Sequence, residues 1–207
     1  MSTSPTTSAY GSEPAWDVAL LFPPQGQWSV EEYLSLTDDI NRFVEFTAGR
    51  IEVLPTPTVI HQRILVFLFM RLKEFVDAHD LGEVLPSVLR VRLAEDKFRE
   101  PDIVFLGRGK DSGLGRYWDK ADLVVEIVSD DRKSRERDHI KKRKDYAEAG
   151  ISEYWIVDPQ QQQISVLTLQ GRAYELIGEF TPGQAATSKL LPGFAVDVKA
   201  TFKAAEQ

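Results

Sequence analysis

The sequence predicts an α/β fold in which a mixed central β-sheet is flanked by helices and extended by β-hairpins. Short runs rich in Val, Ile and Phe indicate strands, and longer stretches with helical apolar spacing indicate helices. A hairpin, a helix, strands, a second helix and further strands follow one another, an order that favours a mixed sheet. The 207 residues suffice for one core. We therefore expect one domain over residues 12–207 and a disordered Ser/Thr/Pro-rich tail over residues 1–11.

The N-terminal half supplies a short helix, a hairpin and a long helix. A capping-box pattern at Ser29 begins the short helix. Residues 42–54 are predicted to form a hairpin with a glycine at its turn. Thr58 is expected to cap a long helix that runs to about Ala78 and is closed by Gly82.

The C-terminal half supplies most of the predicted sheet. Pro86 indicates an edge strand or a bulge in the first of these strands. A basic helix is predicted to begin near Asp131 or Ser134 and to end at Gly150. The strands are expected at residues 84–93, 102–106, 122–128 and 153–158, followed by a hairpin over residues 163–177 and a short helix from Asp197.

Two acidic residues lie on apolar strands. They are Asp102, at the start of one run, and Glu126, inside another. A carboxylate on a buried strand is costly unless a cation or hydrogen bonds compensate its charge. Because neighbouring strands lie about 4.8 Å apart, both acids can reach one Mg²⁺, with the Ile127 carbonyl as a further oxygen ligand. Such an ion can activate water for phosphodiester hydrolysis, but the same pattern fits two strand-end carboxylates that face solvent.

A basic segment follows the second acid. Residues 132–144 contain eight Lys or Arg and two Asp or Glu, although the whole chain has a net charge of −7. Lys142 can orient an attacking water and counter negative charge in a transition state. Lys141, Arg143 and Lys144 point elsewhere on a helix and are candidates for phosphate contacts. A solvated helix face is the alternative interpretation of such a run.

Glu45 and His61 are further candidates. Glu45 lies in the predicted hairpin, where it either orients a metal-bound water or faces outward from a strand. His61 borders an apolar helical face, which favours a near-core histidine over a ligand and leaves nucleic-acid contact as its weaker functional role. The three histidines lack metal-ligand spacing and the chain has no cysteine, which disfavours a zinc site.

Other classes of protein lack support in the sequence. We find no glycine-rich phosphate loop, no nucleophile elbow and no thiol, and we expect no organic cofactor. The most apolar stretch, residues 60–70, is too short to span a bilayer, and the N-terminus lacks a signal-peptide pattern. We therefore expect a cytoplasmic protein without membrane association.

Five segments together carry a resemblance to a known family. They are Phe43–Ile51, Pro57–Ile64, Arg99–Asp102, Ala121–Ser129 and Arg137–Pro159. Over about residues 28–180 the chain resembles the Uma-two family of putative restriction endonucleases, within the PD-(D/E)XK nuclease superfamily. The aromatic and acidic string that ends the last segment is the most specific part of the match.

The resemblance implies a restriction-endonuclease-like core and Mg²⁺-dependent DNA cleavage, with Mn²⁺ as a substitute ion. It makes Asp102 and Glu126 metal ligands. The superfamily lysine stands two residues after the second acid, where this chain has Val128; the family places it on the following helix, at Lys142. Glu45 matches the acid from the N-terminal part of the fold.

Three functions follow from these observations. The first is a metal-dependent DNA endonuclease, which would act as a homodimer if it cuts both strands of a duplex. The second is a non-catalytic nucleic-acid-binding or assembly protein that retains the nuclease fold. The third is a metal hydrolase for small phosphoesters. The acid–lysine set favours the first function, and the acidic net charge favours the second.

Overall fold

The computed structural model describes residues 19–40, 42–110, 115–129 and 137–206, without the side chains of residues 137–139. The predicted disordered tail over residues 1–11 lies outside these ranges. The helices are α2 (Val30–Asp39), α3 (Val59–Ala78), η1 (Arg137–Lys142, a π-helical turn), α5 (Arg143–Glu148), α6 (Val198–Lys203) and η2 (Ala204–Glu206). The strands are β1 (Val44–Thr47), β2 (Arg50–Val53), β3 (Gly82–Pro86), β4 (Val91–Ala94), β5 (Lys97–Arg99), β6 (Ile103–Gly107), β7 (Leu123–Ile127), β8 (Glu153–Asp158), β9 (Gln163–Gln170), β10 (Ala173–Phe180), β11 (Ala185–Thr187) and β12 (Ala195–Asp197).

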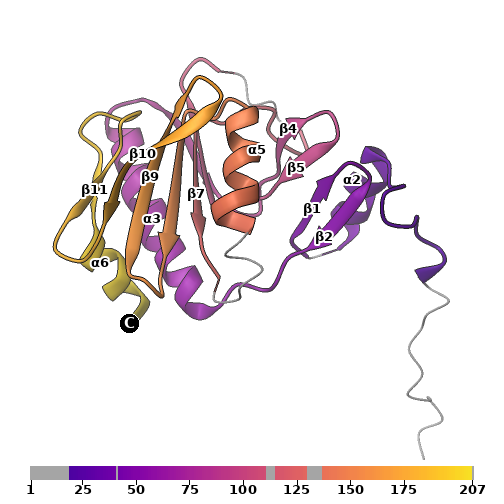
Figure 1. Ribbon diagram of the computed structural model, residues 1–207, viewed down its shortest axis with the longest axis horizontal. Coiled ribbons are helices and arrows are strands. Elements are labelled where there is room, and N and C mark those ends of the chain that lie inside the picture. The colour runs from indigo at the N-terminus through magenta and orange to yellow at the C-terminus, as the bar shows by residue number, and fades with distance from the viewer. Residues whose placement is uncertain (1–18, 41, 111–114, 130–136, 207) are drawn as a thin grey trace, which may run out of the picture.

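A mixed six-stranded sheet forms the centre of the molecule, with the strand order β10-β9-β8-β7-β6-β3. Its strands pair antiparallel except β7 and β8, which pair parallel and are joined through η1 and α5, as a parallel pair requires a crossover. Helix α3 lies behind this sheet in Figure 1 and α5 lies in front of it. A four-stranded sheet, β2-β1-β5-β4, lies to one side. The predicted α/β fold with a mixed sheet and added hairpins is confirmed.

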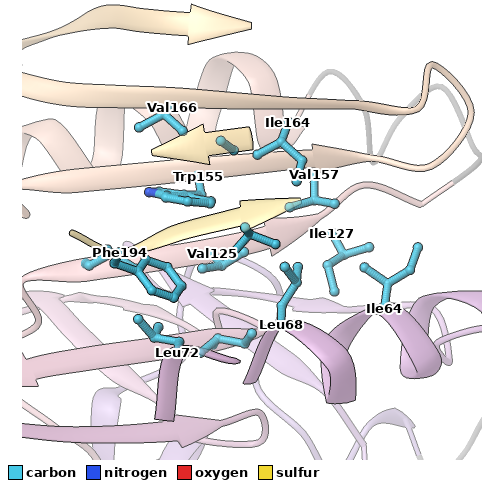
Figure 2. Packing of buried hydrophobic residues seen from close by; sticks show 14 of the residues in the cluster. Ile64, Leu68, Leu72, Val125, Ile127, Trp155, Val157, Ile164, Val166 and Phe194 are labelled. Carbon is cyan, nitrogen blue, oxygen red and sulfur yellow. The ribbon is translucent and has the colours of Figure 1, made fainter. Parts of the chain in front are cut away.

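Alternation along β7 decides which side chains meet which helix. Val125 and Ile127 belong to the core on the α3 side, where Figure 2 shows them with Ile64 and Leu68. Val124 belongs to the core on the α5 side. Because successive side chains of a strand point to opposite faces, Glu126 also points toward α5. The second core therefore surrounds a carboxylate.

The predicted helix starts are confirmed at both N-terminal helices. Ser29 and Glu32 form a complete capping box at α2. Thr58 caps α3 through the His61 backbone N–H. Helix α3 ends at Ala78, as predicted, but Gly82 does not close it: Asp80 adopts the left-handed conformation, with φ of 53°, and Gly82 already begins β3.

The predicted strand over residues 84–93 is wrong as a single element. The structure contains β3 and β4 there, in different sheets. Pro86 ends β3, which is an edge strand as its proline predicted, because proline has no N–H to donate. The strands β5, β11 and β12 were not predicted, since three residues are too few to show a period.

The basic helix differs from the prediction in its first turns. Residues 137–142 form a π-helical turn before α5. The predicted caps Asp131 and Ser134 lie outside the described ranges. Among the described residues, no helix has the length and apolar character needed to span a membrane.

Candidate functional site

A narrow pocket opens where the start of β6 and the end of β7 meet the start of α3 and the segment after β2. Its volume of about 40 Å³ suits a few water-sized groups rather than an organic ligand. The pocket is lined by Phe43, Leu54, Pro55, Pro57, His61, Glu100, Asp102, Glu126, Ile127, Ser129 and Lys142. Four of the predicted site residues with functional side chains therefore line one cavity: His61, Asp102, Glu126 and Lys142.

Asp102 lies immediately before β6 and joins two other elements. Its Oδ2 accepts a hydrogen bond of 2.7 Å from the Ile127 backbone N–H at the end of β7. The His61 Nε2 atom of α3 lies 3.2 Å from the same carboxylate. His61 is thus a buried neighbour of Asp102, and it lines the pocket beside that carboxylate.

Lys142 lies between two buried carboxylates. Its Nζ is 2.8 Å from Glu126 Oε1 and 3.2 Å from Glu45 Oε1. Only 2% of the Lys142 side chain is exposed, which excludes the solvated helix face as its environment. Lys142 therefore reaches the acid on β7, although fifteen residues lie between Glu126 and Lys142 in the sequence.

Tyr146 holds the same carboxylate from α5. Its hydroxyl donates a hydrogen bond of 2.5 Å to Glu126 Oε1. Lys142 and Tyr146 are four residues apart, so one helical face can bring both to Glu126. Burial, and next the charge of Glu126, raise the pKa of the Tyr146 hydroxyl well above its usual value, which keeps it a donor.

An ion network on the far side of Glu45 ties β5 to α5. Arg99 Nε lies 3.6 Å from Glu45 Oε2, and Arg99 Nη2 lies 2.6 Å from Asp145 Oδ2. Burial opposes the charge on Arg99, but the carboxylates of Glu45 and Asp145 outweigh it and raise the pKa of the guanidinium. Lys97 Nζ adds a contact of 2.7 Å to Asp145. The small sheet is thereby attached next to Lys142.

Glu100 is a pocket residue that sequence reasoning missed. Its Oε2 accepts a hydrogen bond of 3.2 Å from the Val44 N–H, and its Oε1 lies 3.6 Å from Arg90 Nε. Burial raises the pKa of Glu100 to about 7, against the opposing effect of Arg90. The available signal was its place two residues before Asp102.

The remaining basic candidates lie on the surface of the same helical segment. Lys141, Arg143 and Lys144 are exposed. Arg143 donates to the Tyr174 carbonyl at 2.9 Å, and Lys144 lies 3.7 Å from Glu148. Lys141 lines a groove of about 430 Å³, together with residues of the β1–β2 hairpin such as Arg50.

The pocket has oxygen donors that suit a hard divalent cation. Asp102 and Glu126 both line it, beside Ile127. Within the described ranges, no three Asp, Glu or His side chains are grouped as a metal-binding cluster. Mg²⁺ is nevertheless commonly held by one or two carboxylates, with water and substrate oxygens as its other ligands. Two carboxylates in a water-sized pocket therefore fit such an ion.

Comparisons with known proteins agree with the observed fold. The model of a family described as "Uma2: Putative restriction endonuclease" matches residues 30–199. A solved structure, that of "a putative nuclease belonging to DUF820" from Anabaena variabilis ATCC 29413, is similar with a TM-score of 0.65 and 18% sequence identity. The match covers 83% of this chain and 98% of that one. No curated protein matches this chain.

Proposed function

Because this chain belongs to the Uma2 family, whose model is described as "Putative restriction endonuclease", we propose that it is a metal-dependent DNA endonuclease. The proposed site is the pocket that holds Asp102 and Glu126. The observation that carries the proposal is the buried Lys142, which contacts Glu126 at the wall of that pocket. A lysine and carboxylates around a small polar cavity are what hydrolysis of a phosphodiester requires.

The ligand set follows from the residues around the pocket. Asp102, Glu126 and the Ile127 carbonyl would hold Mg²⁺ or Mn²⁺. When bound, such an ion supplies an activated water and neutralises charge on the phosphate. His61 and the Ile127 N–H fix the orientation of the Asp102 carboxylate, since both lie within hydrogen-bond distance of it.

Lys142 has the role of positioning water and countering charge. Its ammonium group carries three donors, and two of them can be directed at Glu45 and Glu126. Its positive charge can in addition act on the attacking water or on a phosphate oxygen. Glu45 holds the ammonium from the side opposite Glu126, and Tyr146 restrains Glu126 itself. The proposal thus assigns Glu45 a positioning role.

DNA contact is proposed for the exposed basic residues next to the site. Lys141, Arg143 and Lys144 lie directly beside Lys142 in sequence and can neutralise phosphates. Cleavage of both strands of a duplex would need two copies of the pocket, which a symmetric dimer provides.

Nicking of supercoiled plasmid tests the proposed function. We expect cleavage with Mg²⁺ or Mn²⁺, none with EDTA, and a loss of at least about a hundredfold in Asp102→Asn protein. Asp122→Asn is a matched control, because Asp122 also accepts a backbone hydrogen bond, 2.8 Å from the Gly107 N–H, but lies outside the pocket.

Three other outcomes would contradict the proposal. DNA binding without cleavage would support the non-catalytic alternative. Cleavage of nucleotides but not of plasmid would support a hydrolase for small phosphoesters. Equal nicking by the Asp102→Asn variant would indicate a contaminating nuclease.

A further inference from the structure

We infer that a hollow beside the pocket receives one unstacked nucleobase of the strand that is cut, an inference that rests on the proposed nuclease function. The hollow has a volume of about 340 Å³ and lies between the start of α3, the β8–β9 turn and the C-terminal turn η2. It shares His61 and Ser129 with the pocket that holds Asp102. A nucleotide with its phosphate in the pocket could therefore place its base in the hollow.

The inner wall of the hollow is apolar. Ile64, Val128 and Phe202 line it and are themselves part of the buried cores. Ile60 also lines it, yet half of that residue is exposed to solvent. A flat ring placed in the hollow would cover part of this exposed apolar surface. Burial of apolar surface stabilises a complex by about 25 cal/mol per Å².

Polar side chains lie at the rim of the hollow. Gln160 and Gln162 line it from the β8–β9 turn, and both are exposed. Asp158 fixes this turn, because its Oδ1 accepts from the backbone N–H groups of Gln160 and Gln161 at 3.0 and 3.1 Å. An amide side chain carries both donors and acceptors and can pair with the edge of a base.

The charged residues of the hollow differ from those of the groove that Lys141 lines, which indicates where the base and the sugar-phosphate backbone would lie. Glu206 is the charged residue of the rim, and a carboxylate repels phosphate. The groove that Lys141 lines carries a surplus of positive charge, because Arg50, Arg99 and Lys141 line it against the two carboxylates of Glu45 and Glu52. Phosphates are therefore expected near Lys141, and the uncharged base is expected in the hollow.

The size of the hollow selects the form of the substrate. Its volume is near the lower end of the range for small-molecule sites. A base that is paired and stacked in a duplex cannot enter such a site without leaving the stack. The preferred substrate is therefore a single strand, or a duplex that is frayed or distorted at the cleavage position.

Binding of short oligonucleotides tests this inference separately from cleavage. Fluorescence anisotropy would be measured with a labelled single-stranded oligodeoxynucleotide, in EDTA and with Ca²⁺ in place of Mg²⁺. We expect the double variant Ile60→Ala/Gln162→Ala to bind about tenfold more weakly than the unmodified protein. The matched control is Val59→Ala/Gln161→Ala, which alters neighbouring exposed residues that do not line the hollow and should bind as the unmodified protein does.

A second probe identifies the base as the recognised group. An oligonucleotide of abasic sugar-phosphates should bind more weakly and equally to the unmodified protein and to the Ile60/Gln162 variant. Equal affinity of both proteins for the normal strand would overturn the inference, as would duplex binding as tight as single-strand binding. If no form of the protein cleaved DNA but the binding pattern held, the proposed nuclease function would fail and the base site would stand.

Discussion

Glu126 on β7 and Glu153 on β8 are buried carboxylates on neighbouring parallel strands, but different groups compensate their charges. Glu153 accepts from four neutral donors: the Trp155 indole at 2.7 Å, the Ser188 hydroxyl at 2.6 Å and two backbone N–H groups at 2.7 and 2.8 Å. Glu126 instead faces the ammonium of Lys142 and the hydroxyl of Tyr146.

The difference distinguishes a structural acid from a candidate functional one. The donors to Glu153 attach the segment around Ser188 to the sheet, and Glu153 lines none of the cavities described above. Glu126 lines a pocket and is held by groups that could also engage a substrate. Burial of a carboxylate therefore does not by itself indicate function, whereas the chemistry of its partners does.

Removal of the Lys142 ammonium group, which contacts Glu126, should have the largest effect on stability. Lys142→Met would remove the ammonium that contacts both Glu45 and Glu126, leaving Arg99 beside Glu45 and the neutral Tyr146 hydroxyl beside Glu126. We expect it to lower the free energy of unfolding by about 4 kcal/mol, as the loss of one partner from a buried ion pair typically does. Chemical denaturation at neutral pH measures this change. The addition of Glu45→Gln should restore part of the loss; a double variant as unstable as the single one would show that repulsion is not the cause.

A matched pair of isosteric changes compares the two acids directly. In Glu153→Gln the NH2 of the new amide would face the indole and backbone N–H donors that bind the carboxylate, and two donors cannot pair. We therefore expect the free energy of unfolding to fall by about 3 kcal/mol. In Glu126→Gln the amide oxygen can take the place of Oε1 and still accept from both Tyr146 and Lys142, so we expect a loss below about 1 kcal/mol. Denaturation curves for both proteins provide the test, and equal losses would remove the distinction between the acids.

The raised pKa of Glu100, which lines the pocket, predicts that the stability of the protein depends on pH. The pKa of Glu100 is raised from the ordinary value of 4.5 to about 7 in the folded state. Between these two pH values the folded state therefore binds more protons than the unfolded state. Stability from this group must therefore fall as pH rises through that window. Between pH 5 and pH 8, the unmodified protein should lose about 2 kcal/mol relative to Glu100→Gln. Parallel stability curves for the two proteins would contradict this assignment.

Divalent ions that bind in the Glu126 pocket should stabilise the protein, and we expect this to be the smallest of the four effects on stability. At about ten times its dissociation constant, an ion that binds the folded state contributes about 1.4 kcal/mol. That corresponds to a rise in melting temperature of about 4 °C for a protein of this size. We expect Mg²⁺ or Mn²⁺ to produce this shift in the unmodified protein and in Glu153→Gln, but not in Asp102→Asn. The absence of any shift, together with no heat of binding in calorimetry, would exclude the metal site.

Local patterns in the sequence predicted most of the regular elements. The caps at Ser29 and Thr58 and the apolar run that forms the strand around Glu126 depend on neighbouring residues alone, so they could be predicted from the sequence. The short strands β5, β11 and β12 could not, because long-range pairing and not periodicity forms them. For the same reason, the separation of β3 from β4 was not visible.

The candidate site was predicted less completely than the fold. Asp102 and Glu126 stood out because acids are unusual on apolar strands. The burial of Lys142 could not be read from a basic run, since it depends on a π-helical turn and on Glu45 from a distant hairpin. Glu100 was missed because its partners Val44 and Arg90 come from other strands or loops.

The initial rate of plasmid nicking by Glu126→Gln and Glu153→Gln, compared at equal concentrations of folded protein with Mg²⁺, tests the central claim most directly. We expect Glu126→Gln to be at least about a hundredfold slower than the unmodified protein, because it alters the proposed metal ligand. We expect Glu153→Gln, once folded, to cleave within a few-fold of the unmodified rate. An undiminished rate in Glu126→Gln, or equal losses in both variants, would contradict the assignment of the Glu126 pocket as the site of cleavage.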